Sequence, residues 1–162
     1  MTQQPQTGEA SYLFSGDSPR YLGIDFGDKN IGIAISDPTG IIATPLTTIV
    51  RANAATIKPY VAQIGQMIKE HHITAIVLGL PKNMDNTQSE RAAITIDFKE
   101  RLERNFKRTP VILWDERLTS VGAERFFREQ NIKAKDQKKL IDELAACIIL
   151  QNYLDYQANN AK

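Results

Sequence analysis

The feature that most constrains the fold is a run of three closely spaced strand patterns at the start of the chain. Residues 31–36 alternate isoleucine with small residues, which is the two-residue period of a strand. An apolar run at 21–25 precedes this segment, and residues 37–40 have the composition of a turn. We expect a third strand from 41–43, with a possible extension over 47–50. Because short connections join the three segments, they should pair antiparallel.

The pattern then changes to an alternation of helices and strands. Apolar residues at helical spacing over 57–68 precede an apolar strand at 73–78, which the sequence Gly79-Leu80-Pro81 should end. Thr87 and Glu90 have capping-box spacing, and the helix that follows should reach about residue 107. The remaining expected elements are a strand at 111–114, a brief helix at 121–129 and a long helix at about 137–156. This order predicts an α/β fold, a mixed sheet with helices on its faces.

Length and composition predict one domain. The chain has 162 residues, of which 42% are hydrophobic, so one sizeable core is expected over residues 19–158. Residues 1–18 are polar, and we interpret them as a flexible extension rather than a signal peptide. Apolar runs are too short to cross a bilayer. We therefore expect a cytoplasmic protein without membrane contact, in which the single Cys147 is a buried apolar filler.

Acidic residues stand at the ends of two expected strands and near the start of the last helix. Asp25 ends the first strand, Asp115 and Glu116 end the last one, and Asp142 shares a helix face with alanines. Because side chains alternate along a strand, only one member of the adjacent pair can face a common site. Each acid alone also has a structural interpretation, as a turn or helix cap, a salt-bridge partner or a favourable first-turn residue.

Basic and amide side chains follow the same strand ends. Lys82 and Asn83 come after the strand at 73–78, Arg117 follows the acidic pair, and Lys138 and Lys139 precede Asp142. Cationic side chains bordering an acidic centre suit a polyanion whose phosphates must be held. The alternative is a solvated loop and helix start, and a net charge of +1 does not decide between the two.

Four motifs together carry a resemblance to a known family. They occupy residues 25–34, 77–85, 115–120 and 142–146, in this order. Together they resemble the YqgF family of bacterial proteins, described as Holliday junction resolvases and as pre-16S rRNA processing nucleases. The resemblance covers about residues 21–156. It implies an RNase H-like fold with a five-stranded mixed sheet whose first three strands are antiparallel, in agreement with the element order above.

The resemblance also implies a metal-dependent nuclease centre at Asp25, Glu116 and Asp142, with Asp115 as the alternative to Glu116. These carboxylates would hold Mg²⁺ or Mn²⁺, hard cations that prefer oxygen ligands. The implied partner is structured nucleic acid, either precursor rRNA during ribosome biogenesis or branched DNA, bound by a monomer or weak homodimer. Asn30 stands where the family often has arginine, which weakens a phosphate contact there.

Two other classes of function remain open at this point. Asp25 and Gly27, followed by a short strand, also resemble the phosphate loop of actin-type and sugar-kinase-type ATPases. Those proteins need two such domains, and this chain has the length of one. The other alternative is an RNA-binding or ribosome-binding module with a weak catalytic centre.

Overall fold

The structure, a computed structural model, describes residues 19–53, 56–81, 90–116, 131 and 133–160, and for residues 134–143 only the backbone. Five strands and three helices lie in these ranges. The strands are β1 (Tyr21–Phe26), β2 (Asn30–Ser36), β3 (Ala43–Val50), β4 (Ala75–Leu80) and β5 (Val111–Asp115). The helices are α2 (Lys58–His71), α3 (Glu90–Asn105) and α5 (Ala134–Asn160).

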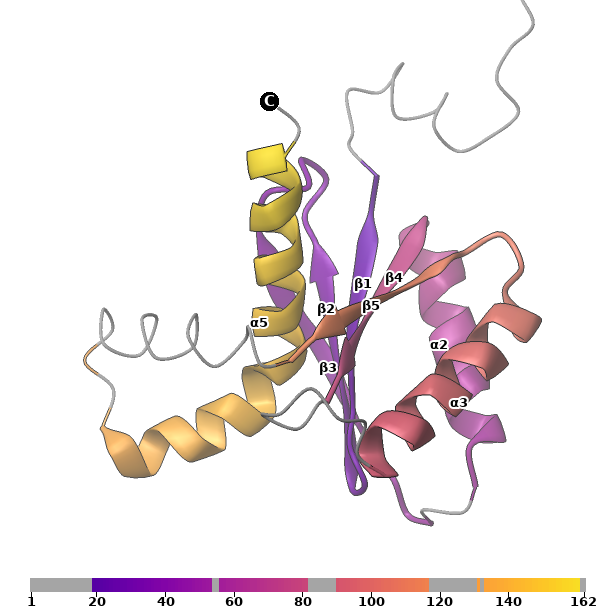
Figure 1. Ribbon diagram of the computed structural model, residues 1–162, viewed down its shortest axis with the longest axis horizontal. Helices are drawn as coiled ribbons and strands as arrows, with labels where there is room; N and C mark the ends of the chain where they lie inside the picture. Colours follow the sequence, from indigo (N-terminus) through magenta and orange to yellow (C-terminus); the bar gives the residue numbers. More distant parts are fainter. Residues whose placement is uncertain (1–18, 54–55, 82–89, 117–130, 132, 161–162) are drawn as a thin grey trace, which may run out of the picture.

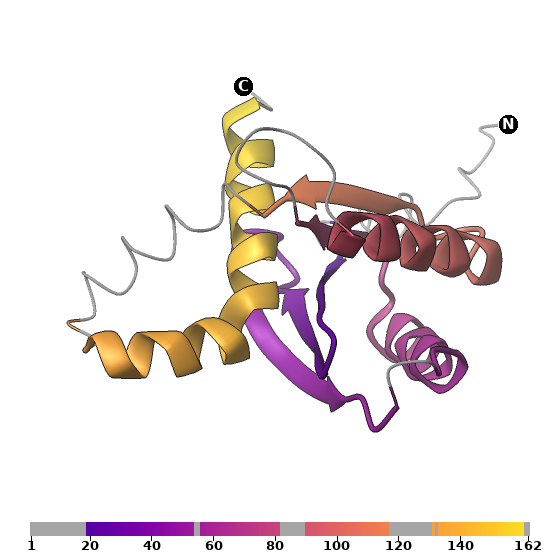
Figure 2. The same ribbon diagram turned by 60° about the horizontal axis from the view of Figure 1, so that its bottom comes forward.

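The strands form one mixed sheet in the order β3-β2-β1-β4-β5. The first three strands pair antiparallel, whereas β4 is parallel to both β1 and β5. Helix α5 covers one face of the sheet, and α2 and α3 cover the other (Figures 1 and 2). The predicted α/β fold with a five-stranded mixed sheet is therefore confirmed.

The third strand begins later than predicted, at Ala43. Ile41 and Ile42 are exposed, because the Asp37 carboxylate accepts hydrogen bonds from both of their backbone amides, each at 2.9 Å. These bonds, with others from Thr39, lower the pKa of Asp37 to about 2. The turn at 37–40 was predicted correctly, but the same aspartate holds the next two apolar residues outside the sheet.

Other element boundaries also differ from the prediction. Strand β4 runs two residues past the expected end at residue 78, since Gly79 and Leu80 pair with Trp114 and Asp115 of β5. The helix expected to reach residue 107 ends at Asn105. Helix α5 extends past both expected ends, and its first part turns away from the sheet (Figure 1). Thr87, the helix at 121–129 and the extension at 1–18 lie outside the described residues.

Because side chains alternate along each strand, the two faces of the sheet carry side chains of different size. Toward α2 and α3, β1 presents Leu22, Ile24 and Phe26, and Phe26 stacks on Phe98 with ring centroids 4.0 Å apart. Toward α5 the central strands present small side chains, among them Ala34 and the glycines of β1, β2 and β4. The buried part of α5 therefore packs close to the sheet.

Replacing Gly23 by alanine should show how tightly α5 packs. A Cβ at position 23 would lie 2.7 Å from Leu150 Cβ and 2.9 Å from the Ala146 carbonyl oxygen. Since backbone must move, we expect a loss of about 1–3 kcal/mol in the free energy of unfolding, measured by urea denaturation. Gly32→Ala is the control, because its Cβ would meet nothing closer than 3.5 Å. Equal effects of both variants would contradict the close packing.

Polar contacts anchor α5 to the start of β3. The Gln151 side-chain oxygen accepts a hydrogen bond from the Ala43 amide at 2.8 Å, and its nitrogen donates to the Ile41 carbonyl at 2.9 Å. Cys147 was expected to be buried, but it is half-buried, and its thiol donates to the Ala43 carbonyl at 3.1 Å. In the part of the chain that the structure describes, no helix combines the length and apolar character needed to cross a membrane.

Candidate functional site

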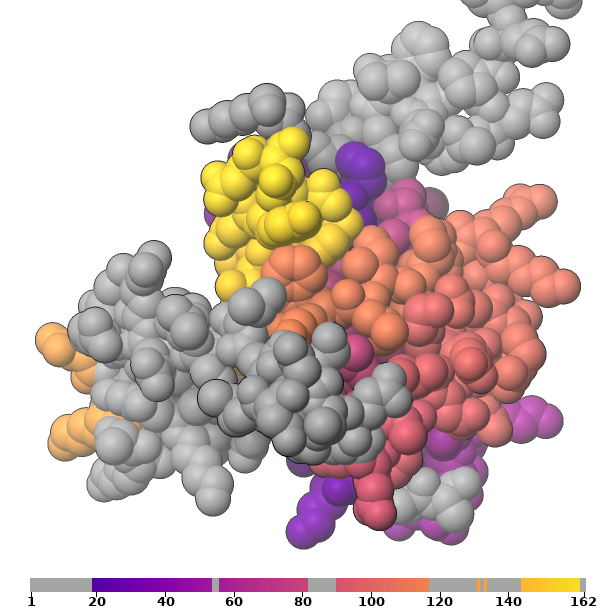
Figure 3. Space-filling model, in the orientation of Figure 1, coloured from indigo at the N-terminus to yellow at the C-terminus, as the bar shows by residue number. Residues whose placement is uncertain are grey.

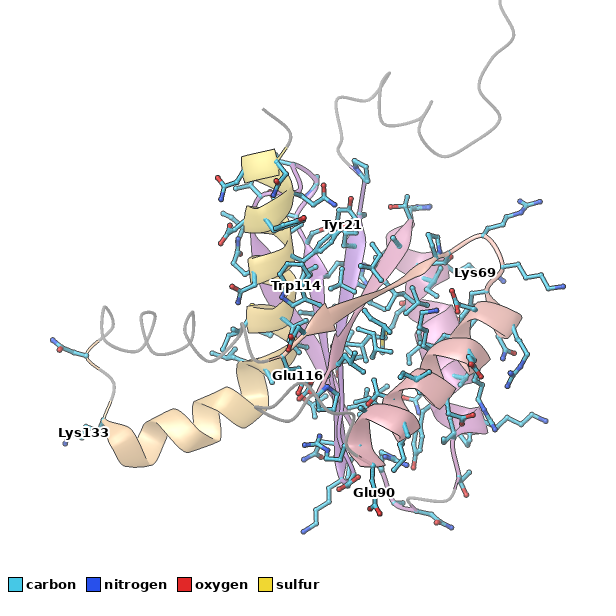
Figure 4. All side chains as sticks on the ribbon, in the orientation of Figure 1. Tyr21, Lys69, Glu90, Trp114, Glu116 and Lys133 are labelled. Atoms are coloured by element: carbon cyan, nitrogen blue, oxygen red, sulfur yellow. The ribbon has the colours of Figure 1, made fainter. Side chains whose placement is uncertain are left out.

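Asp25 and Glu116 come together at one edge of the sheet. They lie at or just after the carboxyl ends of β1 and β5, which are both parallel to β4 between them. Gly79 of β4 leaves the space that Glu116 occupies, since a Cβ at position 79 would lie 2.7 Å from Glu116 Oε1. The Glu116 side chain thus passes over β4 and shares a hydrogen bond with the Asp25 carboxylate. Figure 4 shows Glu116 at the end of β5, between α5 and α3.

The structure distinguishes the two adjacent acids by the face of the sheet each occupies. Ile112 and Trp114 pack in the core under α5, and Trp114 contacts Tyr153 with ring centroids 5.6 Å apart. Figure 3 shows the yellow part of α5 in contact with the orange β5 on this side. Glu116 comes two residues after Trp114 and so belongs to the same face of the strand as Ile112 and Trp114. Asp115 belongs to the opposite face, with Leu113, which packs against the core under α2 and α3. The acid that meets Asp25 is therefore Glu116.

Burial next to a second carboxylate makes Glu116 an unusual acid. Burial contributes most to raising its pKa, followed by the charge of Asp25 and the hydrogen bond to Asp25, with a smaller contribution from Asp115. The positive charge of Arg91 acts in the opposite direction. The resulting pKa is about 8, so near neutral pH Glu116 keeps its proton.

The raised pKa should make the metal-free protein less stable as the pH rises. Between its ordinary value of 4.5 and about 8, Glu116 keeps a proton when folded that it loses when unfolded. Raising the pH through this window therefore favours unfolding. We expect Glu116→Gln to remove this contribution and to melt a few degrees above the wild type at pH 9, since 1 kcal/mol corresponds to about 2–4 °C.

Thermal melts at pH 5 and pH 9, with EDTA present throughout, measure the effect. Glu100→Gln, on the exposed side of α3, is the control and should follow the wild type at both values. If the melting temperatures of the wild type and of Glu116→Gln change by the same amount from pH 5 to pH 9, the raised pKa of Glu116 is contradicted.

The donor set of this site fits a divalent cation. The negative charges of Asp25 and of an ionised Glu116 repel each other, and a cation would relieve this repulsion. Oxygen ligands are those that Mg²⁺, Mn²⁺ and Ca²⁺ prefer. Among the described side chains, no three acidic, histidine or cysteine residues form a group able to hold a metal ion. The predicted third ligand, Asp142, has only its backbone described. It lies one helical turn before Ala146, whose Cβ faces Gly32 beside Asp25.

The predicted phosphate-binding residues lie largely outside the described structure. Lys82, Asn83 and Arg117 are in undescribed segments, and for Lys138 and Lys139 only the backbone, within α5, is described.

Arg91 was not predicted from the sequence as a residue of this site. This exposed residue lies in the first turn of α3, near enough to Glu116 to lower its pKa. Its only sequence signal was a basic residue at the start of a helix that follows a strand of the central sheet.

Comparison with known proteins identifies both the fold of this chain and the family that it matches. RuvC of Thermus thermophilus, solved in complex with a Holliday junction substrate, superposes with a TM-score of 0.52 at 13% identity, over 87% of this chain and 96% of that one. At this identity the likeness concerns the fold, which is the RuvC-like, RNase H-type fold. Residues 19–156 also match the family described as "RuvX: Holliday junction resolvase".

Relatives at higher identity carry the name "Putative pre-16S rRNA nuclease". The protein from Agathobacter rectalis is 43% identical, over 87% of this chain and 98% of its own length. That from Thermoanaerobacter pseudethanolicus is 47% identical, over 86% of this chain and 99% of its own length. The chain belongs to the RuvX family, also called YqgF.

Proposed function

We propose that this protein is a metal-dependent endonuclease that processes the precursor of 16S rRNA. The observation that carries the proposal is the Asp25–Glu116 pair, two carboxylates held together at the edge of a RuvC-like sheet. The names of the relatives, which cover nearly their whole length, support precursor rRNA as the substrate. The family description supports cleavage of branched DNA as the second candidate.

Asp25, Glu116 and Asp142 are proposed to hold the cation. A divalent metal bound there would supply Lewis-acid stabilisation of a phosphodiester and lower the pKa of a water. The protein residues set the position of the ligands: Gly79 admits the Glu116 side chain, and the close approach of Ala146 to Gly32 brings α5 to the same edge. Glu116 must lose its proton for the metal to bind, so binding should strengthen as the pH rises toward 8.

A cleavage assay that offers precursor rRNA and a four-way DNA junction side by side tests the substrate. We expect Mg²⁺- or Mn²⁺-dependent cuts in the RNA near the mature 5′ end and little cleavage of the junction. Symmetric resolution of the junction would instead favour the DNA candidate, and it would require a two-fold dimer, which a measurement of mass in solution detects. Unchanged RNA binding without cleavage in any metal would favour the binding-module alternative, and tight magnesium-ATP binding would favour the nucleotide-binding one.

Arg91 is proposed to contact a phosphate next to the scissile bond, because it is exposed and close to Glu116. We expect Arg91→Gln to weaken RNA binding about fivefold at low salt and to reduce the salt slope by about 1, as for loss of one phosphate contact. Filter binding across a salt series measures both quantities. Arg108→Gln, exposed beyond the far end of α3, is the control and should leave the slope unchanged.

A further inference from the structure

A second candidate site lies on the opposite side of the sheet. A cavity of about 430 Å³ is lined by residues of α2 and of the C-terminal end of α3. Both helices lie on the face of the sheet opposite α5 (Figure 2). Its volume falls in the range of small-ligand pockets. Asp25 and Glu116 face α5, so none of the residues that line this cavity belongs to the site described above.

Part of the cavity lining is apolar and includes an aromatic ring. Val61 and Ala62 of α2 line it together with Phe106, which follows α3. The Phe106 ring lies directly against Gly65, where a Cβ would come within 2.8 and 2.9 Å of two ring carbons. Because Gly65 has no side chain, the ring can pack against the backbone of α2. An aromatic wall of this kind suits the planar face of a nucleobase.

Three further lining residues are cationic. Lys58 of α2 and Arg101 and Arg104 of α3 line it, and no carboxylate does so among the described residues. The neighbouring Glu103 forms an ion pair with Lys99 at 2.7 Å. The Nε of Arg101 is buried and has no hydrogen-bond partner in the described part of the chain. A phosphate oxygen is the acceptor that a guanidinium binds most strongly.

We propose that this cavity binds one nucleotide, with its phosphate between Lys58, Arg101 and Arg104 and its base against Phe106. The presence of apolar, aromatic and cationic side chains in one lining carries the proposal, since inorganic phosphate would use only the cationic ones. The nucleotide is either a free nucleoside phosphate or one unit of an RNA strand. The proposal goes beyond the nuclease function and does not depend on it.

NMR titration of the ¹⁵N-labelled full chain, with EDTA present, tests the proposal. The ligands are nucleoside 5′-monophosphates, a short oligoribonucleotide and inorganic phosphate, each added alone. We expect saturable shifts of the Gly65 and Phe106 amides. Shifts with the monophosphates identify a free nucleotide as the source, and shifts with the oligoribonucleotide alone identify an RNA strand. No shift with any nucleotide, or inorganic phosphate binding as tightly as the nucleotides, would overturn the proposal.

Charge-matched variants distinguish nucleotide binding in the cavity from general electrostatic attraction to the protein surface. Arg101→Gln/Arg104→Gln should weaken nucleotide binding by about tenfold or more, since hydrogen bonds to charged groups are lost. Lys107→Gln/Arg108→Gln removes the same charge from exposed neighbours outside the cavity and should stay within about twofold. Arg104→Gln alone, at an exposed position, serves if the double variant does not fold. Equal weakening by the cavity and control variants would overturn the proposal.

Discussion

Asp25→Asn is expected to reduce metal-dependent cleavage by at least about a hundredfold, since loss of a metal ligand removes several kcal/mol of transition-state stabilisation. The substitution keeps the size of the side chain but replaces one of the two carboxyl groups that meet at the sheet edge by a neutral amide. It also removes the charge that helps to raise the pKa of Glu116. Because a metal ligand is lost, the apparent affinity for Mg²⁺ should fall together with the rate.

Initial rates over a series of Mg²⁺ and Mn²⁺ concentrations measure both effects. Asp97→Asn makes the same chemical change at an exposed position of α3 and should cleave like the wild type. Thermal melts in EDTA establish that Asp25→Asn is folded. Full cleavage by a folded Asp25→Asn protein would remove this carboxylate from the proposed centre.

Gly79→Ala should have a comparable effect on cleavage without touching any carboxylate. The added Cβ would lie 2.7 Å from Glu116 Oε1 and 2.6 Å from Ile149 Cδ1. Both atoms are at the ends of flexible side chains, so the fold can accommodate the methyl group, but Glu116 must leave its place beside Asp25. We expect about a tenfold to hundredfold loss of rate, since a displacement of about 1 Å can cost a hundredfold.

Gly32→Ala is the matched control for this variant. It adds the same methyl group to the same face of the sheet, next to Asp25, at ordinary contact distances of 3.5 and 3.8 Å. Its cleavage rate should stay close to that of the wild type. If Gly79→Ala also cleaves at the wild-type rate and melts normally, the observed position of Glu116 is not the active one.

Strands with a two-residue apolar period could be predicted from sequence, and boundaries set by distant contacts could not. The isoleucines of β2 all enter one core, so their alternation located the strand. Gly79 has a low intrinsic preference for strands, yet it continues β4 because β5 supplies backbone hydrogen-bond partners. Arg91 was missed for a similar reason, since its approach to Glu116 depends on how α3 packs rather than on a motif.

The sequence by itself determined the candidate acids and the rule that Asp115 and Glu116 face opposite sides of a strand. Only the tertiary structure decided which acid meets Asp25. The register of β5 on β4 directs Ile112, Trp114 and Glu116 toward α5, and Gly79 leaves the gap across which the two carboxyl groups meet. Alternation is a local property of one strand, whereas the choice of face depends on what packs against it.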